Sequence, residues 1–454
     1  MMNIYDIKVK MKSRLGELWW YTIIMFMTQQ LGSVINAVIG LWLVPKYVPK
    51  EELGALLPLA SIGSLLGLPL TILMIPFMKF LTKYMAQEEY GKVKSLLRDV
   101  FILAGVTFLV VSGLAYLFMP LVFERMRVEN GILSLLIICS GTIGALAPVF
   151  STALQALKRF KMMSLLGFMG SLVRFGTLLI ALPVRGLSGY FVGQLVALIF
   201  GILASLWALR RYLSFKVKRI SYWSEDWKLI LRYIKWIALL YVAWTLQGAV
   251  ESFVIRHRLP AIESAGYYMI SRFAEISTYI GLSVMVVIFP LVSERSERGQ
   301  VDNRLLKQSI LSSLVFGLVV SCLLFFIGKW VMGLVNEWRI YIVFQPLLVW
   351  LGVLFTMRSC ISCFTLHEMA MSRFSAIKWL SAVSFIEASF LYSMFSTSLL
   401  YSYFPNQLTE WVSTLKVNTL SSVLCVITVF VSLQFCIVIH AMFFYKSTNE
   451  VQHV

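Results

Sequence analysis

The chain has 454 residues, of which 59% are hydrophobic and only 14% are charged, and its mean hydropathy is +0.81. A soluble domain is about half apolar and about a quarter charged, so this composition excludes a soluble globular protein and indicates a polytopic membrane protein. The net charge of +18 is spread over short loops between apolar runs, a pattern that sets membrane orientation, so we expect no nucleic-acid partner.

Apolar runs long enough to cross a membrane recur along the whole chain. A bilayer core needs about 20 apolar residues per helix, and the sequence offers twelve candidates. In chain order the predicted spans are Trp19–Val44, Gly54–Phe80, Val100–Phe123, Ile132–Leu157, Ser164–Leu182, Gly189–Leu209, Tyr233–Ile255, Ala265–Val292, Gln308–Gly328, Tyr341–Leu366, Phe374–Leu399 and Val417–Tyr445. We therefore predict an all-α bundle of about 12 transmembrane helices. Gly63 and Gly67 in the second span have the spacing that lets two helices pack closely.

The longest stretch between spans divides the chain into six helices plus six. We predict an N-terminal six-helix lobe over residues 1–209, a cytoplasmic amphipathic linker over 210–232 and a C-terminal six-helix lobe over 233–454. In the linker, Trp223 and Trp227 are set against Glu225 and Asp226, which suits a helix at the membrane interface.

The two predicted lobes share a weak internal repeat. Residues 49–54 begin with proline and end with glycine, as do residues 260–266, and Pro76 and Pro290 follow the two glycines 22 and 24 residues later. Two six-helix halves begin on the same side of the membrane, so the repeat is parallel, with its axis along the membrane normal. Transporters built from such repeats place their site between the halves, so we expect a central cavity there.

Lysine and arginine are unevenly divided between the two sides of the predicted bundle. With the N-terminus in the cytoplasm, the inner segments carry 24 of these residues and the outer loops carry 10. Basic residues in short loops accumulate on the cytoplasmic side. We therefore expect both termini in the cytoplasm.

Six ionisable residues lie inside predicted spans, where a charge costs from about 3 to more than 10 kcal/mol. They are Arg174, Glu251, Arg272, Glu275, Arg358 and Glu387. Their cost means that they face a protein interior or a wet cavity. Spacing places Gln247 with Glu251, and Arg272 with Glu275, on common helical faces.

The three arginines have two interpretations. A guanidinium offers a planar fork of donors and a permanent charge, so Arg174, Arg272 and Arg358 are candidates for binding an anionic substrate such as a pyrophosphate. Alternatively, Arg272–Glu275 and Arg358–Glu387 are salt bridges that hold helices together. Gln29 and Asn36 are further substrate-binding candidates, through sugar hydroxyls, or else they bond helices to one another. Glu251 and Glu275 are the candidates for ion coupling, and Glu387 is the acid that best fits a structural role.

Signatures of enzymes are missing from the sequence. It lacks a G-x-x-x-x-G-K-[ST] loop for nucleotide phosphates, and in the segment that begins His367-Glu368, Met371 stands where a zinc protease has its second histidine. The four aspartates are far apart in the chain. We therefore predict a protein that is not an enzyme and has no catalytic residues, metal site or cofactor.

Three stretches together resemble a known family. They are residues 48–54 with the prolines after them, residues 154–161 continuing to Gly189, and residues 265–290. The chain resembles the polysaccharide-export branch of the multidrug/oligosaccharidyl-lipid/polysaccharide exporter superfamily, the O-antigen-type flippases. That resemblance implies two lobes around a central cavity and transfer of undecaprenyl-pyrophosphate-linked sugars from the inner to the outer leaflet. Glu251 stands near a position where the family often has aspartate.

The function we expect is a flippase for lipid-linked oligosaccharide, working by alternating access in surface polysaccharide, O-antigen and lipopolysaccharide synthesis. Its place would be the bacterial inner membrane, with the lipid bilayer, a proton or sodium ion, and a polysaccharide polymerase as partners. One alternative is a multidrug cation exporter of the same superfamily. Another is a membrane polymerase or glycosyltransferase, for which Leu400–Lys416 is the candidate exterior loop.

Overall fold

The computed structural model describes residues 30–125, 131–213, 223–297, 303–395 and 420–444. Within these ranges all regular structure is helical, and eight stretches are long and apolar enough to cross a membrane. One of the eight, Phe160–Arg210, covers two of the predicted spans. The protein is therefore an all-α polytopic membrane protein, as its composition predicted.

The amino-terminal half is built around one central helix. Its elements are η1 (Ile39–Leu43), α2 (Val44–Tyr47), α3 (Lys50–Leu53), α4 (Leu56–Ala86), α5 (Tyr90–Arg125), α6 (Gly131–Ala156) and α7 (Phe160–Leu213). Helices α4, α5 and α7 all pack against α6. Gly63 of α4 lies directly on α6, since a Cβ atom at Gly141 would meet the Gly63 Cα at 3.0 Å. The predicted close packing of the second span is thus confirmed.

The long helix α7 contains the fifth and sixth predicted spans. Its chain turns at Gly186, where φ is 49° and ψ is −125°. Only glycine adopts this backbone conformation readily, because it has no Cβ atom. The predicted boundary between the two spans, at residues 183–188, is confirmed.

The carboxy-terminal half differs from the hydropathy prediction in three places. Its elements are α8 (Trp223–Arg258), α9 (Ala261–Ala274), η2 (Glu275–Thr278), α10 (Tyr279–Glu297), α11 (Asn303–Leu334), η3 (Asn336–Phe344), α12 (Gln345–Ala370), α13 (Ser375–Phe395) and α16 (Leu420–Phe444). The eighth predicted span is broken by the 3-10 turn η2. The segment predicted as an amphipathic linker runs directly into α8. A 3-10 turn, η3, precedes α12.

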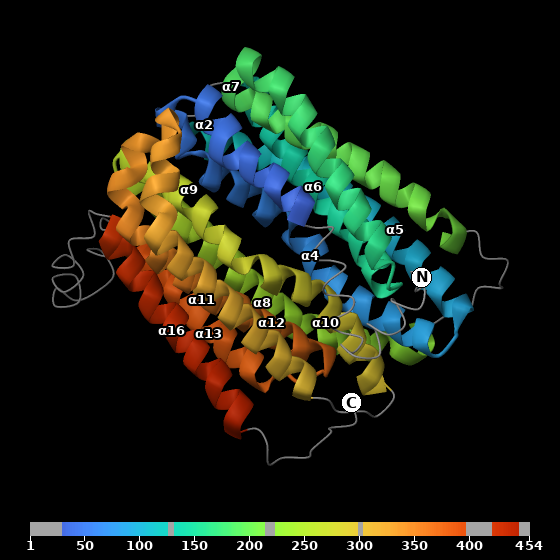
Figure 1. The fold of residues 1–454 in the computed structure, drawn as a ribbon. Coiled ribbons are helices and arrows are strands. Elements are labelled where there is room, and N and C mark those ends of the chain that lie inside the picture. The colour runs from blue at the N-terminus through green and yellow to red at the C-terminus, as the bar shows by residue number, and fades with distance from the viewer. Residues whose placement is uncertain (1–29, 126–130, 214–222, 298–302, 396–419, 445–454) are drawn as a thin grey trace, which may run out of the picture.

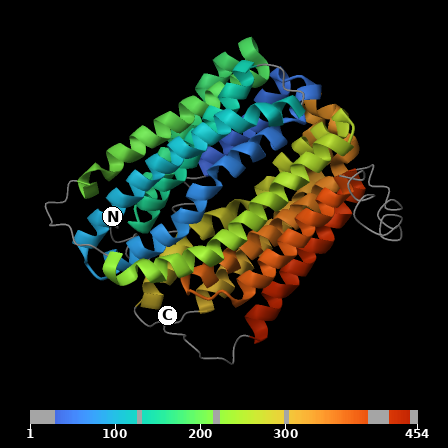
Figure 2. The ribbon, with the colours of Figure 1, turned by 180° about the vertical axis from the view of Figure 1, so that it is seen from behind.

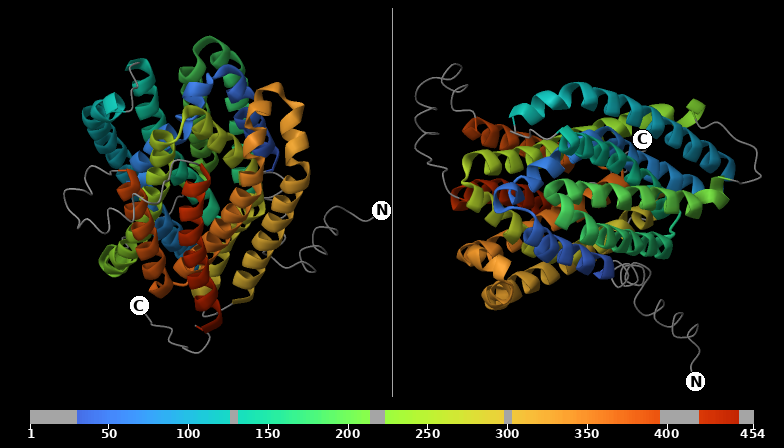
Figure 3. Two further views of the ribbon diagram at one scale, coloured as in Figure 1. Left: turned by 90° about the vertical axis from the view of Figure 1, so that its left-hand side faces the viewer. Right: turned by 90° about the horizontal axis from the view of Figure 1, so that it is seen from above.

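The two halves lie side by side, with their helices running in similar directions (Figures 1 and 3). Seen from behind, the same division is visible, with the blue-to-green half on one side and the yellow-to-red half on the other (Figure 2). Helix α4 provides most of the boundary, packing against α8 and α10, and α9 contacts η1 and α3. The described residues therefore agree with the predicted two-lobed bundle. The lobe boundaries at 209 and 233 stay a prediction.

The equivalent segments of the predicted repeat meet at this boundary. Gly54, which precedes α4, accepts a hydrogen bond at 3.3 Å from the hydroxyl of Ser264, near the start of α9. A Cβ atom at Gly54 would lie only 2.6 Å from that hydroxyl oxygen. Contact between equivalent segments is expected close to a pseudo-twofold axis, and glycine at position 54 is what allows it.

Candidate functional site

A group of polar side chains gathers on the amino-terminal side of the boundary between the halves. Arg174, on α7, donates from Nη1 to the Asn36 side chain at 3.2 Å and from Nη2 to the Tyr190 hydroxyl at 2.8 Å. The guanidinium also lies over the Tyr190 ring, 5.2 Å from its centroid. The Asn36 amide donates to Ser171 at 3.0 Å. Asn36 therefore joins the first predicted span to the fifth, which forms the first part of α7.

A second arginine faces this group from the carboxy-terminal half. Arg272, on α9, pairs with Glu275 at 2.8 Å and lies 5.5 Å from the ring centroid of Tyr268. The Tyr268 hydroxyl donates to the Gly40 carbonyl at 3.3 Å, across the boundary. Tyr268 also lies within electrostatic range of Arg174. The six residues Asn36, Arg174, Tyr190, Tyr268, Arg272 and Glu275 form what we call the interface cluster.

Two irregular turns position the interface cluster. The first helix winds as a π-helix over Ile39–Leu43, and Gly40 packs against the Arg272 side chain, whose Cδ atom lies 3.4 Å from the position of a Cβ at that glycine. Helix α9 ends at Ala274, and the 3-10 turn that follows begins with Glu275. Irregular turns inside spans occur often at functional sites, where they free backbone groups.

The interface cluster carries a net charge of +1, from two arginines and one glutamate. The side chains of Arg272 and Glu275 are 35% and 42% exposed, so solvent or a ligand reaches them. The Nε atoms of Arg174 and Arg272 are buried and have no hydrogen-bond acceptor. Excess positive charge on partly exposed guanidinium groups suits an anion with several oxygens.

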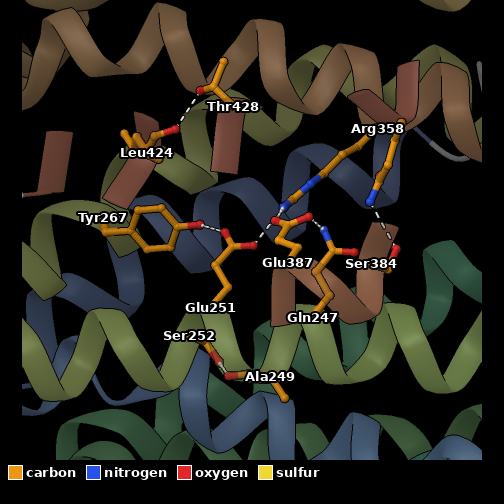
Figure 4. Close-up of polar contacts among 11 residues, drawn as sticks. Gln247, Ala249, Glu251, Ser252, Tyr267, Arg358, Ser384, Glu387, Leu424 and Thr428 are labelled. Atoms are coloured by element: carbon orange, nitrogen blue, oxygen red, sulfur yellow. Dashed lines mark hydrogen bonds and ion pairs between the residues drawn. The ribbon is translucent and has the colours of Figure 1, made fainter. Parts of the chain in front are cut away.

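A different cluster is buried inside the carboxy-terminal half (Figure 4). Arg358 of α12 pairs with Glu251 of α8 at 2.8 Å and lies 3.9 Å from Glu387 of α13. Gln247 donates to Glu387 at 2.8 Å, and the Tyr267 hydroxyl donates to Glu251 at 2.6 Å. These five residues form what we call the buried cluster. The spacing that placed Gln247 and Glu251 on one face is confirmed, because both enter this cluster.

The buried cluster has more acid than base. Glu387 is 0% exposed and Glu251 is 5% exposed, and the Oε1 atom of Glu387 has no hydrogen-bond partner. One arginine between two carboxylates leaves a net charge of −1 when both are ionised. A buried charge without compensation is costly, so this cluster favours uptake of a proton or a small cation. Among the described residues no group of three or more histidine, cysteine, aspartate or glutamate side chains could hold a metal ion.

The structure divides the predicted site residues between the two clusters. Arg174, Arg272, Asn36 and Glu275 lie in the interface cluster, whereas Arg358 and Glu251 lie in the buried cluster. Arg358 is predicted to pair with Glu387, and its nearer carboxylate is Glu251. Gln29 lies outside the described residues.

Three tyrosines of these clusters were not predicted. Tyr268 precedes Arg272 by one helical turn, and that spacing signals an aromatic ring beneath a cation. Tyr190 and Tyr267 give no comparable signal, because their partners Arg174 and Glu251 each lie 16 positions earlier in the chain.

The fold is similar to those of several solved transporter structures. An outward-facing multidrug resistance MATE family transporter of the MOP superfamily matches with a TM-score of 0.68 and 11% identity, covering 96% of this chain and 98% of that one. A MATE protein in the straight conformation gives 0.67 and 12%, with coverage of 95% and 96%. The Vibrio cholerae MATE transporter VcmN in the bent form gives 0.62 and 13%, with coverage of 94% and 99%. The fold is that of the MOP transporters.

Sequence comparison gives the family. The model of the lipid II flippase MurJ family matches residues 67–338, more than half of the chain, so the chain belongs to that family. No curated protein sequence matched. The superfamily predicted from the resemblance is confirmed. The family consists of flippases rather than enzymes, in agreement with the prediction of a transporter.

Proposed function

We propose that the protein flips a polyprenyl-pyrophosphate-linked saccharide across the membrane by alternating access. The observation that carries this proposal is the interface cluster, in which each half contributes one arginine beside one tyrosine. Two partly exposed guanidinium groups fit the oxygens of a pyrophosphate better than they fit a drug cation. Membership of a flippase family supports the same conclusion.

Binding of the pyrophosphate would act on the ion pair of Arg272 and Glu275. The two residues hold each other at 2.8 Å. A pyrophosphate is a stronger partner for the arginine, so it would displace the glutamate and bring Arg174 and Arg272 onto one ligand. Because the two arginines come from different halves, the bound headgroup would draw the halves together. Asn36 would contact the headgroup, and the polyprenyl tail would stay in lipid.

Energy for transport would enter through the acidic residues. We assign ion coupling to Glu251, with Glu387 as its partner and Arg358 as the shared counter-charge, and to Glu275 through its pair with Arg272. A proton or sodium ion at Glu251 would neutralise the buried cluster. A membrane potential of 100 mV supplies about 2.3 kcal/mol per charge moved, enough to bias the cycle.

The central experiment replaces Arg272. In vesicles containing the purified protein and a labelled undecaprenyl-pyrophosphate saccharide, Arg272→Ala should abolish flipping while the protein stays folded. Arg272→Lys should retain part of the activity, because an ammonium group lacks the planar fork. Arg210→Ala is the matched control, since Arg210 also stacks on an aromatic ring, 4.9 Å from the centroid of Trp207, and belongs to neither cluster.

A double variant separates ligand binding from a structural role. If Arg272 served only to neutralise Glu275, then Arg272→Ala combined with Glu275→Ala would restore flipping, because no charge would be left unpaired. Recovery of flipping to the wild-type rate would overturn the proposed role of Arg272. We expect the double variant to stay inactive.

The saccharide itself is the finer part of the proposal. We propose an oligosaccharide unit for surface polysaccharide such as O-antigen, handed on to a polymerase; the family match favours lipid II as a second candidate. Expression in a strain that lacks its O-antigen flippase, and in another depleted of its lipid II flippase, distinguishes them. Rescue of neither strain, together with increased drug resistance, would instead support a multidrug exporter.

We further propose that the protein lies in the bacterial inner membrane with both termini in the cytoplasm. The loops after α4 and α12 would then be cytoplasmic and the turn before α9 would be external. Gln87, directly after α4, and Ala261, the first residue of α9, are both exposed. A cysteine at position 87 should be protected from an impermeant reagent in whole cells, and a cysteine at position 261 should react. Equal labelling of both would contradict this topology.

A further inference from the structure

A buried lysine joins the two halves at one end of the bundle. Lys79 of α4 is 8% exposed, and its ammonium group donates to the Ser372 hydroxyl and, at 3.5 Å, to the Ala370 carbonyl. It also lies 4.9 Å from the ring centroid of Tyr233. The Tyr233 hydroxyl donates to the carbonyl of Met369. Lys79 thus sits at the negative end of the α12 helix dipole, a favourable place for a cation.

A second lysine makes an equivalent crossing nearby. The Lys158 ammonium, in the turn between α6 and α7, forms an ion pair with Glu294 of α10. The two side chains are 27% and 19% exposed, so the pair is only partly screened by water. Both crossings lie at the end of the bundle where α4, α6, α10 and α12 terminate, which we call the basic end.

The turns at Lys158 and Ser372, which take part in these contacts, share a backbone conformation with positive φ. Lys158 has φ of 54° and Ser372 has φ of 57°, a left-handed conformation that is costly for residues with a Cβ atom. Each turn closes with the same two hydrogen bonds: Lys158 N to Gln155 O at 2.9 Å with Arg159 N to Leu154 O at 2.8 Å, and Ser372 N to Met369 O at 3.0 Å with Arg373 N to Glu368 O at 2.8 Å. The sequences also agree, since residues 156–160 and 370–374 each begin with alanine and end with Arg-Phe.

The two crossings are related by the internal repeat. Lys79 follows Pro76 by three residues in the second span, and Glu294 follows Pro290 by four in the eighth. The turns at Lys158 and Ser372 follow the fourth and tenth spans. A residue of the second span therefore meets the turn after the tenth, and a residue of the eighth span meets the turn after the fourth. Each crossing is the pseudo-symmetric counterpart of the other. Lys79 lies on a span and contacts a turn, whereas Lys158 lies in a turn and contacts a span.

We infer that Lys79–Ser372 and Lys158–Glu294 form a double latch that holds the basic end closed. The opposite end is also joined, by Ser264 with the Gly54 carbonyl and by the Trp338 indole with the Leu41 carbonyl. The interface cluster therefore lies between two joined ends, with Arg272 and Glu275 still 35% and 42% exposed. Access to the cluster from the basic end requires both lysine contacts to break. The latch rests on the alternating access of the proposed function, and it names the residues that control one side of the cycle.

The test measures the separation of the halves at the basic end without any cargo. Spin labels at Gln87→Cys in the amino-terminal half and Ser375→Cys in the carboxy-terminal half, in a chain without its native cysteines, report that distance by pulsed electron paramagnetic resonance. Lys79→Met should increase the population with the longer distance about tenfold, the usual value of a charge-assisted hydrogen bond. Lys235→Met is the control, since Lys235 is exposed and lies over the ring of Trp236 in its own helix, 5.2 Å from the centroid, and it should leave the distances unchanged.

Two further variants keep the inference testable if Lys79→Met fails to fold. Ser372→Ala removes only the acceptor hydroxyl and should also favour the longer distance. For the second contact, Lys158→Glu should open the basic end, and Lys158→Glu combined with Glu294→Lys should close it again. Distances that stay at the wild-type value in Ser372→Ala and in Lys158→Glu would overturn the latch. Because no cargo is present, that result would leave the flippase proposal untouched.

Discussion

The interface cluster and the buried cluster place equivalent helices in opposite electrostatic arrangements. In the amino-terminal half, Asn36 of the first span meets Arg174 of the fifth. In the carboxy-terminal half, Glu251 of the first span is joined through Arg358 to Glu387 of the fifth. The first arrangement surrounds an arginine with neutral partners, whereas the second places an arginine between two carboxylates.

This difference shows how one repeated scaffold can separate two electrostatic tasks. An arginine with neutral partners keeps its charge available for a ligand, and Arg174 is partly exposed. An arginine between two acids is neutralised by them, and the excess negative charge is then available for a small cation. Under the proposed function, this difference assigns anionic cargo to the boundary and a coupling ion to the inside of the carboxy-terminal half.

The largest expected effect is on the stability of the buried cluster. Arg358→Ala would leave two buried carboxylates without a counter-charge, which costs about 3–5 kcal/mol. We expect strongly reduced amounts of folded protein and a lower thermal unfolding midpoint in detergent. Arg358→Met combined with Glu251→Gln and Glu387→Gln should recover stability, because no charge then remains. An Arg358→Ala protein as stable as the wild type would show that the carboxylates are not ionised.

Arg174→Ala should leave stability unchanged and reduce transport. No carboxylate among the described residues pairs with Arg174, so removing it leaves no buried acid exposed to the same penalty. We expect normal thermal stability and a flipping rate lower by about 10- to 100-fold, the value of one or two charge-assisted hydrogen bonds. If stability and flipping fell together, the contrast between the two clusters would be lost.

Glu251→Gln tests whether the buried cluster couples an ion. The amide preserves the size of the side chain and an acceptor for Tyr267, but it cannot bind a proton. A gradient worth about 2.3 kcal/mol per charge can accelerate the wild type by tens of fold at most, and the ratio of rates with and without the gradient should fall to about one in the variant. Glu263→Gln is the control, since Glu263 accepts a backbone hydrogen bond from Leu420 at 2.9 Å and lies outside both clusters. A gradient response retained by Glu251→Gln would remove Glu251 from the coupling mechanism.

The smallest effect concerns Tyr190. Tyr190→Phe keeps the ring beneath Arg174 and removes only the hydroxyl that accepts its hydrogen bond at 2.8 Å. We expect a KM for the lipid-linked cargo that rises by roughly three- to tenfold, the net value of one hydrogen bond, with little change in maximal rate. Tyr212→Phe is the matched control, because Tyr212 accepts from Arg159 at 2.7 Å at the basic end. Equal effects of the two substitutions would argue against a role for Tyr190 in cargo binding.

Much of the fold could be predicted because a membrane span depends on a continuous run of about 20 apolar residues, which is visible in the sequence. The apolar runs predicted α4, α5, α6 and α11, and the predicted ends differ from the observed ends by at most about ten residues. Hydropathy failed where backbone geometry changes without a change in polarity, as at the π-helix Ile39–Leu43 and the 3-10 turn Glu275–Thr278. The 3-10 turn contacts a helix distant in sequence, since the Ser277 hydroxyl donates to the Gly352 carbonyl at 3.1 Å.

The sequence by itself determined the class of protein, the spans and the Arg272–Glu275 pair, because hydropathy and helical spacing act over a few residues. Only the tertiary structure decided which charges meet: Arg358 with Glu251 across 107 positions, Arg174 with Asn36 across 138, and Lys79 with Ser372 across 293. Burial makes each charge require a partner, but the choice of partner depends on how helices distant in sequence pack.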